Sequence, residues 1–264
     1  MIPSYSEHVN QIVDYGDRGA PRGLPCYEAL NVQVTADPGE IPQRDKLILA
    51  LGFGEMFQLL AGQLDKDLFR VVAPRANQDL FGDQSAYGPR ILGQVEAVIA
   101  ELRRDPLSRR CALIVGRPEE CATARLPCTT TVQFLLRGGR LHAMVALRSS
   151  DAVWGLPYDV VQFGALVMAV AHLVSAAPGK MHLTLGSAHV YESTLHLAPL
   201  GEPASRLNFF VDFGAFAENW GDVQRWAELG IGALKRGEPG HRRVEHLHVY
   251  ESFGSRGTRE VEKW

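Results

Sequence analysis

Cysteine is scarce in this sequence, and the pairing that would make it structural is missing. Only four cysteines occur among 264 residues, and none stands in a C-x-x-C pair. Disulfide staples and a structural zinc site are therefore not expected. His246 and His248 alternate as residues on one face of a strand do, but the sequence around them supplies no third ligand. We expect no metal site.

An excess of positive charge is also missing. Lys and Arg number 27 against 30 Asp and Glu, which gives a net charge of −3 at pH 7. Proteins that capture a nucleic-acid backbone need a basic surface. No nucleic-acid partner is expected, and any anionic ligand should be small.

Long uninterrupted hydrophobic runs are absent too. Residues 160–177 form the most apolar stretch, but Gln162, His172 and Ser175 interrupt it. It is shorter than the roughly 20 apolar residues of a membrane span, so we predict a buried helix and no membrane partner. The first residues carry neither a basic leader nor an apolar core, which predicts a cytoplasmic location.

Linkers are missing as well. The overall composition is that of a globular protein. Hydrophobic residues make up 46% and charged residues 22%, enough for a large core. We predict one domain over residues 1–264, with turns at 177–179 and 236–240. Strand runs without regular strand-helix alternation favour an α+β fold, a mixed sheet covered by helices. The expected helices are 46–61, one from 91 to about 104, one from about 160 and one after Ser187; the expected strands are 112–115, 130–136, 141–147, 181–185, 207–211 and 244–250.

Several short motifs concentrate reactive and charged residues in the middle of the chain. The motifs are Leu126-Pro127-Cys128-Thr129, Arg148-Ser149-Ser150-Asp151, Gly155-Leu156-Pro157-Tyr158-Asp159 and His189-Val190-Tyr191, with Glu55, Tyr87-Gly88 and Ser108-Arg109-Arg110 before them. In their order and spacing these motifs resemble the signature of the thymidylate synthase superfamily, which includes synthases and hydroxymethylases. The resemblance runs from about Arg22 to about Val211. From about 212 the chain diverges, with a helix expected at 219–235 and an end unlike that of the synthases.

The resemblance implies a thymidylate synthase-like fold and a one-carbon transferase chemistry. Cys128 would add reversibly to C6 of a pyrimidine ring, which makes C5 nucleophilic. Glu55 and Tyr87 would move protons through ordered water. Arg148 would lower the pKa of the Cys128 thiol. The one-carbon unit would come from 5,10-methylenetetrahydrofolate, with Asp151 as its anchor.

The resemblance also assigns the substrate contacts and a homodimer. A pyrimidine nucleoside monophosphate would place its phosphate on Arg22 and Ser149, with Arg18 as the rival of Arg22. Arg109 and Arg110 would reach the same phosphate from the second subunit. The sugar hydroxyl would be held by two further residues, His189 and Tyr191.

Asp159 occupies the position that reads the pyrimidine edge, and it favours cytosine. Synthases place asparagine there, whereas cytidylate 5-hydroxymethylases carry aspartate, so the resemblance is closest to the latter. Cytosine offers an amino group and an unprotonated N3, which a carboxyl can match by accepting or sharing a proton. The stretch 77–82 holds no tryptophan to shield an intermediate from water. A plain helix cap is the competing interpretation of Asp159.

The sequence therefore predicts a hydroxymethylase acting on CMP or dCMP, without deciding between the two sugars. The first alternative is a dUMP hydroxymethylase or a thymidylate synthase. The second is a nucleotide- or RNA-binding relative without turnover. Retention of Cys128, Glu55, Tyr87 and Arg148 together argues against the second, because binding alone needs no nucleophile.

Overall fold

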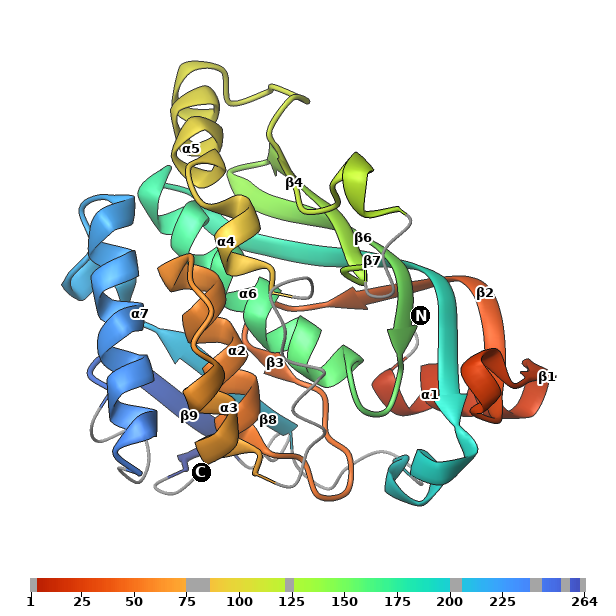
Figure 1. Cartoon of the computed structure of the whole chain (residues 1–264). Helices are drawn as coiled ribbons and strands as arrows, with labels where there is room; N and C mark the ends of the chain where they lie inside the picture. Colours follow the sequence, from red (N-terminus) through yellow and green to blue (C-terminus); the bar gives the residue numbers. More distant parts are fainter. Residues whose placement is uncertain are drawn as a thin grey trace.

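The protein is an α+β structure built on two β-sheets (Figure 1). The computed structural model describes residues 4–74, 86–121, 126–199, 206–237, 244–252 and 257–261. The larger sheet has the order β1-β2-β7-β6-β5-β4 and is mixed, because β6 and β7 run parallel while the other neighbours are antiparallel. Its strands are β1 (Asp17–Gly19), β2 (Cys26–Ala36), β4 (Ala112–Ile114), β5 (Thr129–Arg137), β6 (Arg140–Asp151) and β7 (Ala177–Tyr191).

The smaller sheet is antiparallel and has the order β10-β9-β8-β3. Its strands are β3 (Glu40–Ile41), β8 (Arg206–Val211), β9 (Leu247–Ser252) and β10 (Thr258–Glu260). Seven α-helices lie in the described residues: α1 (Tyr5–Tyr15), α2 (Leu49–Ala61), α3 (Lys66–Val72), α4 (Gly88–Ile91), α5 (Gln94–Arg104), α6 (Leu156–Leu173) and α7 (Trp220–Lys235). Short 3₁₀ turns cover Pro21–Gly23, Pro118–Glu120, Glu192–Leu197 and Phe213–Ala215.

The β5–β6 hairpin confirms the strands expected at 130–136 and 141–147. Gly138 and Gly139 form its two-residue turn, both with positive φ (55° and 72°), between the paired residues Arg137 and Arg140. A primed hairpin turn requires that backbone conformation, which glycine adopts without strain.

Helix α6 is the apolar helix expected from about 160, and it crosses from β6 to the parallel strand β7. By length and hydropathy it could span a membrane, yet 94% of that window is buried inside the protein. It is therefore a core helix. Parallel neighbours need such a crossover, and this one places the carboxyl ends of β6 and β7 at the same end of the sheet.

Two sequence expectations are wrong at the level of elements. No helix begins directly after Ser187: the strand β7 continues to Tyr191 and absorbs 177–179, which were expected to form a turn, and a 3₁₀ turn, Glu192–Leu197, follows. The strand has room only for glycine at position 179, because a Cβ there would meet the Leu141 carbonyl oxygen at 2.8 Å. The helix expected from 91 to about 104 is confirmed as α5, which begins only at Gln94 because Gly93 (φ 81°) separates it from the short helix α4.

The divergent carboxyl-terminal part packs on the same core as the rest. The helix expected at 219–235 is α7, capped by Asn219, and it lies beside α2 in Figure 1. Phe57 of α2 meets Trp226 edge to face at 5.2 Å, and a Cβ on Gly230 would approach the Phe57 ring at 2.5 Å. One buried hydrophobic cluster includes residues of both sheets, which supports the prediction of a single domain.

Candidate functional site

A cavity of about 850 Å³ opens where the ends of the central strands meet helices α2 and α6. Sheet topology explains why the motifs meet there: the carboxyl ends of β6 and β7 and the amino ends of β2 and β5 lie at one end of the sheet. Ten of the twelve predicted site residues line this cavity: Arg22, Glu55, Tyr87, Cys128, Arg148, Ser149, Asp151, Asp159, His189 and Tyr191.

The thiol of Cys128 lies between a hydroxyl and a guanidinium group. Cys128 immediately precedes β5, and Ser149 and Arg148 come from the neighbouring strand β6. Its Sγ is 3.8 Å from Ser149 Oγ and 4.0 Å from Arg148 Nη2. Arg148 Nη1 also donates to Ser149 Oγ at 3.3 Å. The three side chains therefore form one polar cluster on the sheet side of the cavity.

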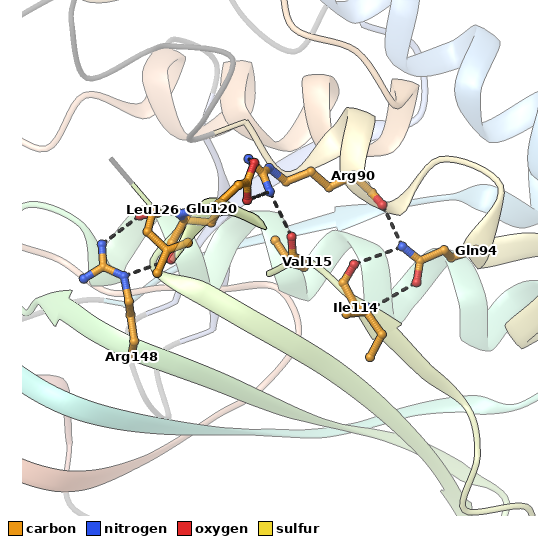
Figure 2. Close-up of polar contacts among 8 residues, drawn as sticks. Arg90, Gln94, Ile114, Val115, Glu120, Leu126 and Arg148 are labelled. Carbon is orange, nitrogen blue, oxygen red and sulfur yellow. Dashed lines mark hydrogen bonds and ion pairs between the residues drawn. The ribbon is translucent and has the colours of Figure 1, made fainter. Parts of the chain in front are cut away.

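Arginines hold the chain at two places, directly before Cys128 and at residues 115–120 (Figure 2). Arg148 donates from Nη2 to the Leu126 carbonyl oxygen at 2.7 Å and from Nε to that of Pro127 at 3.1 Å. At the second place, Arg90 of α4 forms a bidentate ion pair with Glu120, both distances 2.6 Å, and donates to the Val115 carbonyl oxygen at 3.1 Å. We call Arg90 and Glu120 the clamp.

Sequence reasoning did not find the clamp, although a signal was present. Arg90 follows Tyr87-Gly88-Pro89 at the start of an otherwise apolar helical run, and its side chain is only 3% exposed. Buried arginines are nearly always paired, so a charge at this position predicts a partner.

The ionisation of Cys128 differs from the expectation that arginines would lower it. Burial raises the pKa of the Cys128 thiol, and the nearby Asp159 carboxyl raises it further; Arg148, Ser149 and Arg22 only partly oppose this. In the single chain the thiol is therefore protonated near neutral pH. Desolvation outweighs the charges of the two guanidinium groups here.

Asp159 is a buried carboxyl of helix α6, 8% exposed. The helix-cap interpretation is wrong: Gly155 is the N-cap residue, Asp159 lies inside the first turn, and no side-chain cap hydrogen bond is made. Instead, Gln162 Nε2 donates to Asp159 Oδ1 at 3.0 Å. Burial raises the pKa of Asp159 to about 7, with Gln162 opposing the shift. Gln162 was visible in the sequence as a polar residue within an apolar helix.

Glu55 and Tyr87 complete the helix side of the cavity. Glu55 projects from the middle of the apolar helix α2, and burial, followed by the nearby Asp159, raises its pKa to about 8. Burial also raises the pKa of Tyr87, and Asp159 and Cys128 add to that shift. The Tyr87 ring stacks on Phe163 of α6 at 5.9 Å. Near neutral pH these groups are largely protonated, so they can donate protons without carrying charge.

Asp151 stands at the junction of β6 and α6. Its Oδ1 accepts from the backbone N–H groups of Val153 at 2.9 Å and Trp154 at 2.8 Å. Burial raises its pKa, opposed first by these N–H groups. Beside it, Trp154 and Tyr158 form an aromatic wall of the cavity. The buried Arg44 lies over the Trp154 ring at 4.4 Å and donates to the Tyr158 hydroxyl at 2.9 Å.

The far end of the sheet side carries Arg22, His189 and Tyr191. Arg22 lines the cavity in a left-handed conformation (φ 57°). Its rival Arg18 instead donates to the Tyr27 hydroxyl at 2.8 Å and lies over that ring. The rings of His189 and Tyr191 meet edge to face at 4.9 Å. Burial lowers the pKa of His189, so this imidazole is neutral near pH 7.

Two predicted residues lie outside this cavity. Arg110 Nη2 is paired with Glu101 Oε1 at 2.7 Å, and the Arg109 carbonyl oxygen accepts from Gln133 of β5 at 2.8 Å. Within one chain neither residue is brought to Cys128. The tryptophan-free stretch 77–82 lies outside the described residues.

The comparisons with known proteins agree with this geometry. The thymidylate synthase family model matches residues 77–207, about half of the chain. The chain is 37% identical over 108 residues to a thymidylate synthase of Equine herpesvirus 2 (strain 86/87), covering 40% of this chain and 37% of that protein. It is 32% identical over 126 residues to a thymidylate synthase of Ascaris suum, covering 47% of this chain and 42% of that protein. It is 34% identical over 103 residues to a thymidylate synthase of Mycoplasma pneumoniae, covering 39% of this chain and 36% of that protein. The matched part thus spans about two fifths of these relatives' length.

Fold and cavity define an α+β protein in which a cysteine thiol shares a large pocket with guanidinium, hydroxyl and buried carboxyl groups. The matched segment contains Cys128, Arg148, Asp159 and His189. Over residues 77–207 the chain is similar to the thymidylate synthase family.

Proposed function

We propose that this protein is a pyrimidine nucleotide 5-hydroxymethyltransferase that converts CMP or dCMP to its 5-hydroxymethyl derivative. The Cys128 thiolate adds to C6 of the ring, which makes C5 nucleophilic. C5 takes up the one-carbon unit of 5,10-methylenetetrahydrofolate and loses its proton, tetrahydrofolate departs as the leaving group, water adds to the methylene carbon left on C5, and departure of Cys128 from C6 restores the aromatic ring. Arg148 and Ser149 stabilise the thiolate and hold the substrate phosphate with Arg22.

The wall around Asp151 suits the co-substrate. Trp154 and Tyr158 offer aromatic faces, Leu51 and Phe69 add apolar surface, and Asp151 supplies a carboxyl group. A flat heterocycle with polar edges fits such a wall. When bound there, 5,10-methylenetetrahydrofolate supplies the one-carbon unit. Glu55 and Tyr87, which line the same cavity, exchange protons with the pyrimidine and with water.

The observation that carries the choice of cytosine is the environment of Asp159. Gln162 occupies Oδ1, which leaves Oδ2 to face a ligand. With a pKa of about 7, this carboxyl can accept from the C4 amino group of cytosine or share its proton with N3. A neutral carboxyl also avoids the cost of a buried, unpaired charge.

The predicted homodimer is part of the proposal. Along β6, Leu141, Ala143 and Val145 are buried, whereas the alternating His142 and Met144 remain partly exposed. That second face of the sheet has room for another copy of the chain. The Arg109 backbone lies beside it through Gln133, so a second copy on this face would bring Arg109 and Arg110 towards the neighbouring cavity. Light scattering of the purified protein gives the oligomeric state directly.

The first test is release of tritium from C5-labelled CMP, dCMP and dUMP in the presence of 5,10-methylenetetrahydrofolate, with mass analysis of the product. Release from a cytidylate with a hydroxymethyl product supports the proposal. The names of the relatives favour a second candidate, a thymidylate synthase, for which release from dUMP and a methyl product are expected. Nucleotide binding without any release would instead indicate a relative without turnover.

A further inference from the structure

A polar pair outside the family motifs lines the cavity next to His189. Glu28 of β2 and Ser187 of β7 both contribute to the cavity wall. Glu28 is the direct cross-strand partner of His189 in the antiparallel β2–β7 ladder. Side chains of such partners project from the same face with Cβ atoms about 5 Å apart. The Glu28 carboxylate therefore lies beside the group that would hold the sugar.

Hydrogen bonding leaves one oxygen of this carboxylate available. Ser187 Oγ donates to Glu28 Oε1. Among the described residues, Oε2 accepts no hydrogen bond. An ionised carboxylate has acceptors only, so Oε2 calls for a donor from the ligand. Neither the phosphate nor cytosine N3 donates, whereas a sugar hydroxyl does.

We propose that Glu28, oriented by Ser187, accepts a hydrogen bond from the ribose 2′-hydroxyl, which makes the substrate a ribonucleotide. This inference rests on the proposed function, because His189 and Tyr191 are taken to hold the 3′-hydroxyl. The 2′- and 3′-hydroxyls are on adjacent carbons, and Glu28 and His189 are adjacent across the strands. Acidic side chains read the ribose 2′-hydroxyl in the same way in dinucleotide sites.

The consequence is a preference for CMP over dCMP. A deoxyribose would leave Oε2 partly desolvated and without a donor. Loss of a hydrogen bond to a charged group weakens binding by roughly 10- to 100-fold. We expect kcat/KM for CMP to exceed that for dCMP by about this factor.

The test compares the two sugars in the wild type and in two variants of Glu28. Glu28→Ala should lower kcat/KM for CMP by roughly 10-fold or more and leave dCMP nearly unchanged. Glu28→Gln, which keeps size and an acceptor oxygen, should lose less. A matched control is Ser252→Ala, which removes a side-chain bond between β8 and β9 (Asn208 Nδ2 to Ser252 Oγ, 3.3 Å) away from the cavity; both sugars should be unaffected.

Two results would overturn the inference. The wild type could use CMP and dCMP with equal kcat/KM, or Glu28→Ala could lower kcat/KM equally for both nucleotides, which would give Glu28 and Ser187 a structural role only. A failure of the proposed function is separable. If no turnover occurs, or if uridylate is the substrate, titration calorimetry with CMP, dCMP, UMP and dUMP still reports the ribose preference. In that case ribonucleotides should bind more tightly with either base, and Glu28→Ala should abolish the difference.

Discussion

The two sides of the cavity differ in their chemistry. The sheet side presents hydroxyls and the guanidinium groups of Arg22 and the exposed Arg148, beside the carboxyls of Glu28 and Asp151. The helix side presents Glu55 and Asp159, whose pKa values are raised to about 8 and about 7 by burial. Exposure lets the sheet side keep its charge, while burial removes charge from the helix side.

This difference indicates a division of work. Permanent positive charge and hydroxyls bind a phosphate and a sugar. Carboxyls with pKa values near neutrality exchange protons efficiently, because both protonation states are reached. Cys128 belongs to the sheet side but responds to both sides: Arg148 favours its thiolate, while burial and Asp159 favour the thiol. We infer that binding of a substrate to the basic side decides when the thiolate forms.

The largest effect is expected from Cys128, whose ionisation depends on both sides. Cys128→Ser should lower kcat by roughly 10⁴-fold or more, as when a covalent nucleophile acting with its partners is removed. Nucleotide binding should persist, since Arg22, Arg148 and Ser149 are unchanged. Single-turnover kinetics and calorimetry measure the two quantities. Cys111→Ser, at a buried cysteine outside the cavity, is the control. Substantial turnover by Cys128→Ser would show that another group acts as nucleophile.

The next effect tests the helix side as a proton donor. Glu55→Gln keeps the shape but cannot exchange protons, so kcat should fall by roughly 10²- to 10³-fold. In the wild type, activity that needs the protonated carboxyl should decline as pH rises through about 8, and the variant should lose this limb. A pH profile of kcat that is unchanged in the variant would remove Glu55 from the proton path.

Stability gives an internal control for Glu55. Its folded-state pKa is raised above the ordinary value of 4.5. The folded state therefore holds its proton more tightly than the unfolded state, and stability is lost as pH rises from about 4.5 to about 8. Glu55→Gln should be more stable than the wild type at pH 9 and not at pH 4 in urea unfolding. A variant less stable at both values would indicate disrupted packing.

A smaller effect is expected at Asp159, where the change should alter specificity more than rate. Asp159→Asn lets Gln162 Nε2 donate to the amide oxygen, which turns the amide NH₂ towards the ligand. That arrangement favours a uracil O4 acceptor, and the ratio of kcat/KM for cytidylate over uridylate should fall by roughly 10- to 100-fold. Gln162→Leu should weaken discrimination without reversing it. An Asp159→Asn enzyme that keeps its cytidylate preference would overturn the role assigned to Asp159.

Contiguous parts of the site were predictable from the sequence, and parts made by long-range packing were not. The residues of 126–129, 148–159 and 189–191 sit in short motifs, and the structure brings them to one cavity. The strands 130–136 and 141–147 alternate clearly and turn at two glycines. Strand β2 was missed because Glu28, Asn31 and Gln33 interrupt its pattern. Asn31 has positive φ (54°), which disturbs the alternation there.

The ionisation of the site also lay beyond the sequence. An arginine near a cysteine suggests a lowered thiol pKa, but the balance depends on how deeply the thiol is buried and on Asp159, 31 positions away in the chain. Likewise, the pairing of Glu28 with Ser187 joins two strands separated by most of the molecule's sequence. Such pairings follow from the strand order, which the motifs do not specify.

The smallest effect is expected from the clamp, because it acts on Cys128 only through the chain. Glu120→Gln removes one charge of the Arg90 pair, while Arg148 still holds Leu126 and Pro127. Misplacement of a reacting group can cost 10²-fold per ångström, but with one anchor kept we expect kcat to fall by less than about 10-fold. The control is Asp67→Asn, which removes an ion pair with Arg70 exposed on both sides and should change nothing. A loss at Glu120 equal to that at Cys128 would place the clamp in the chemistry itself, and the contrast between a binding side and a proton-exchanging side would no longer account for the site.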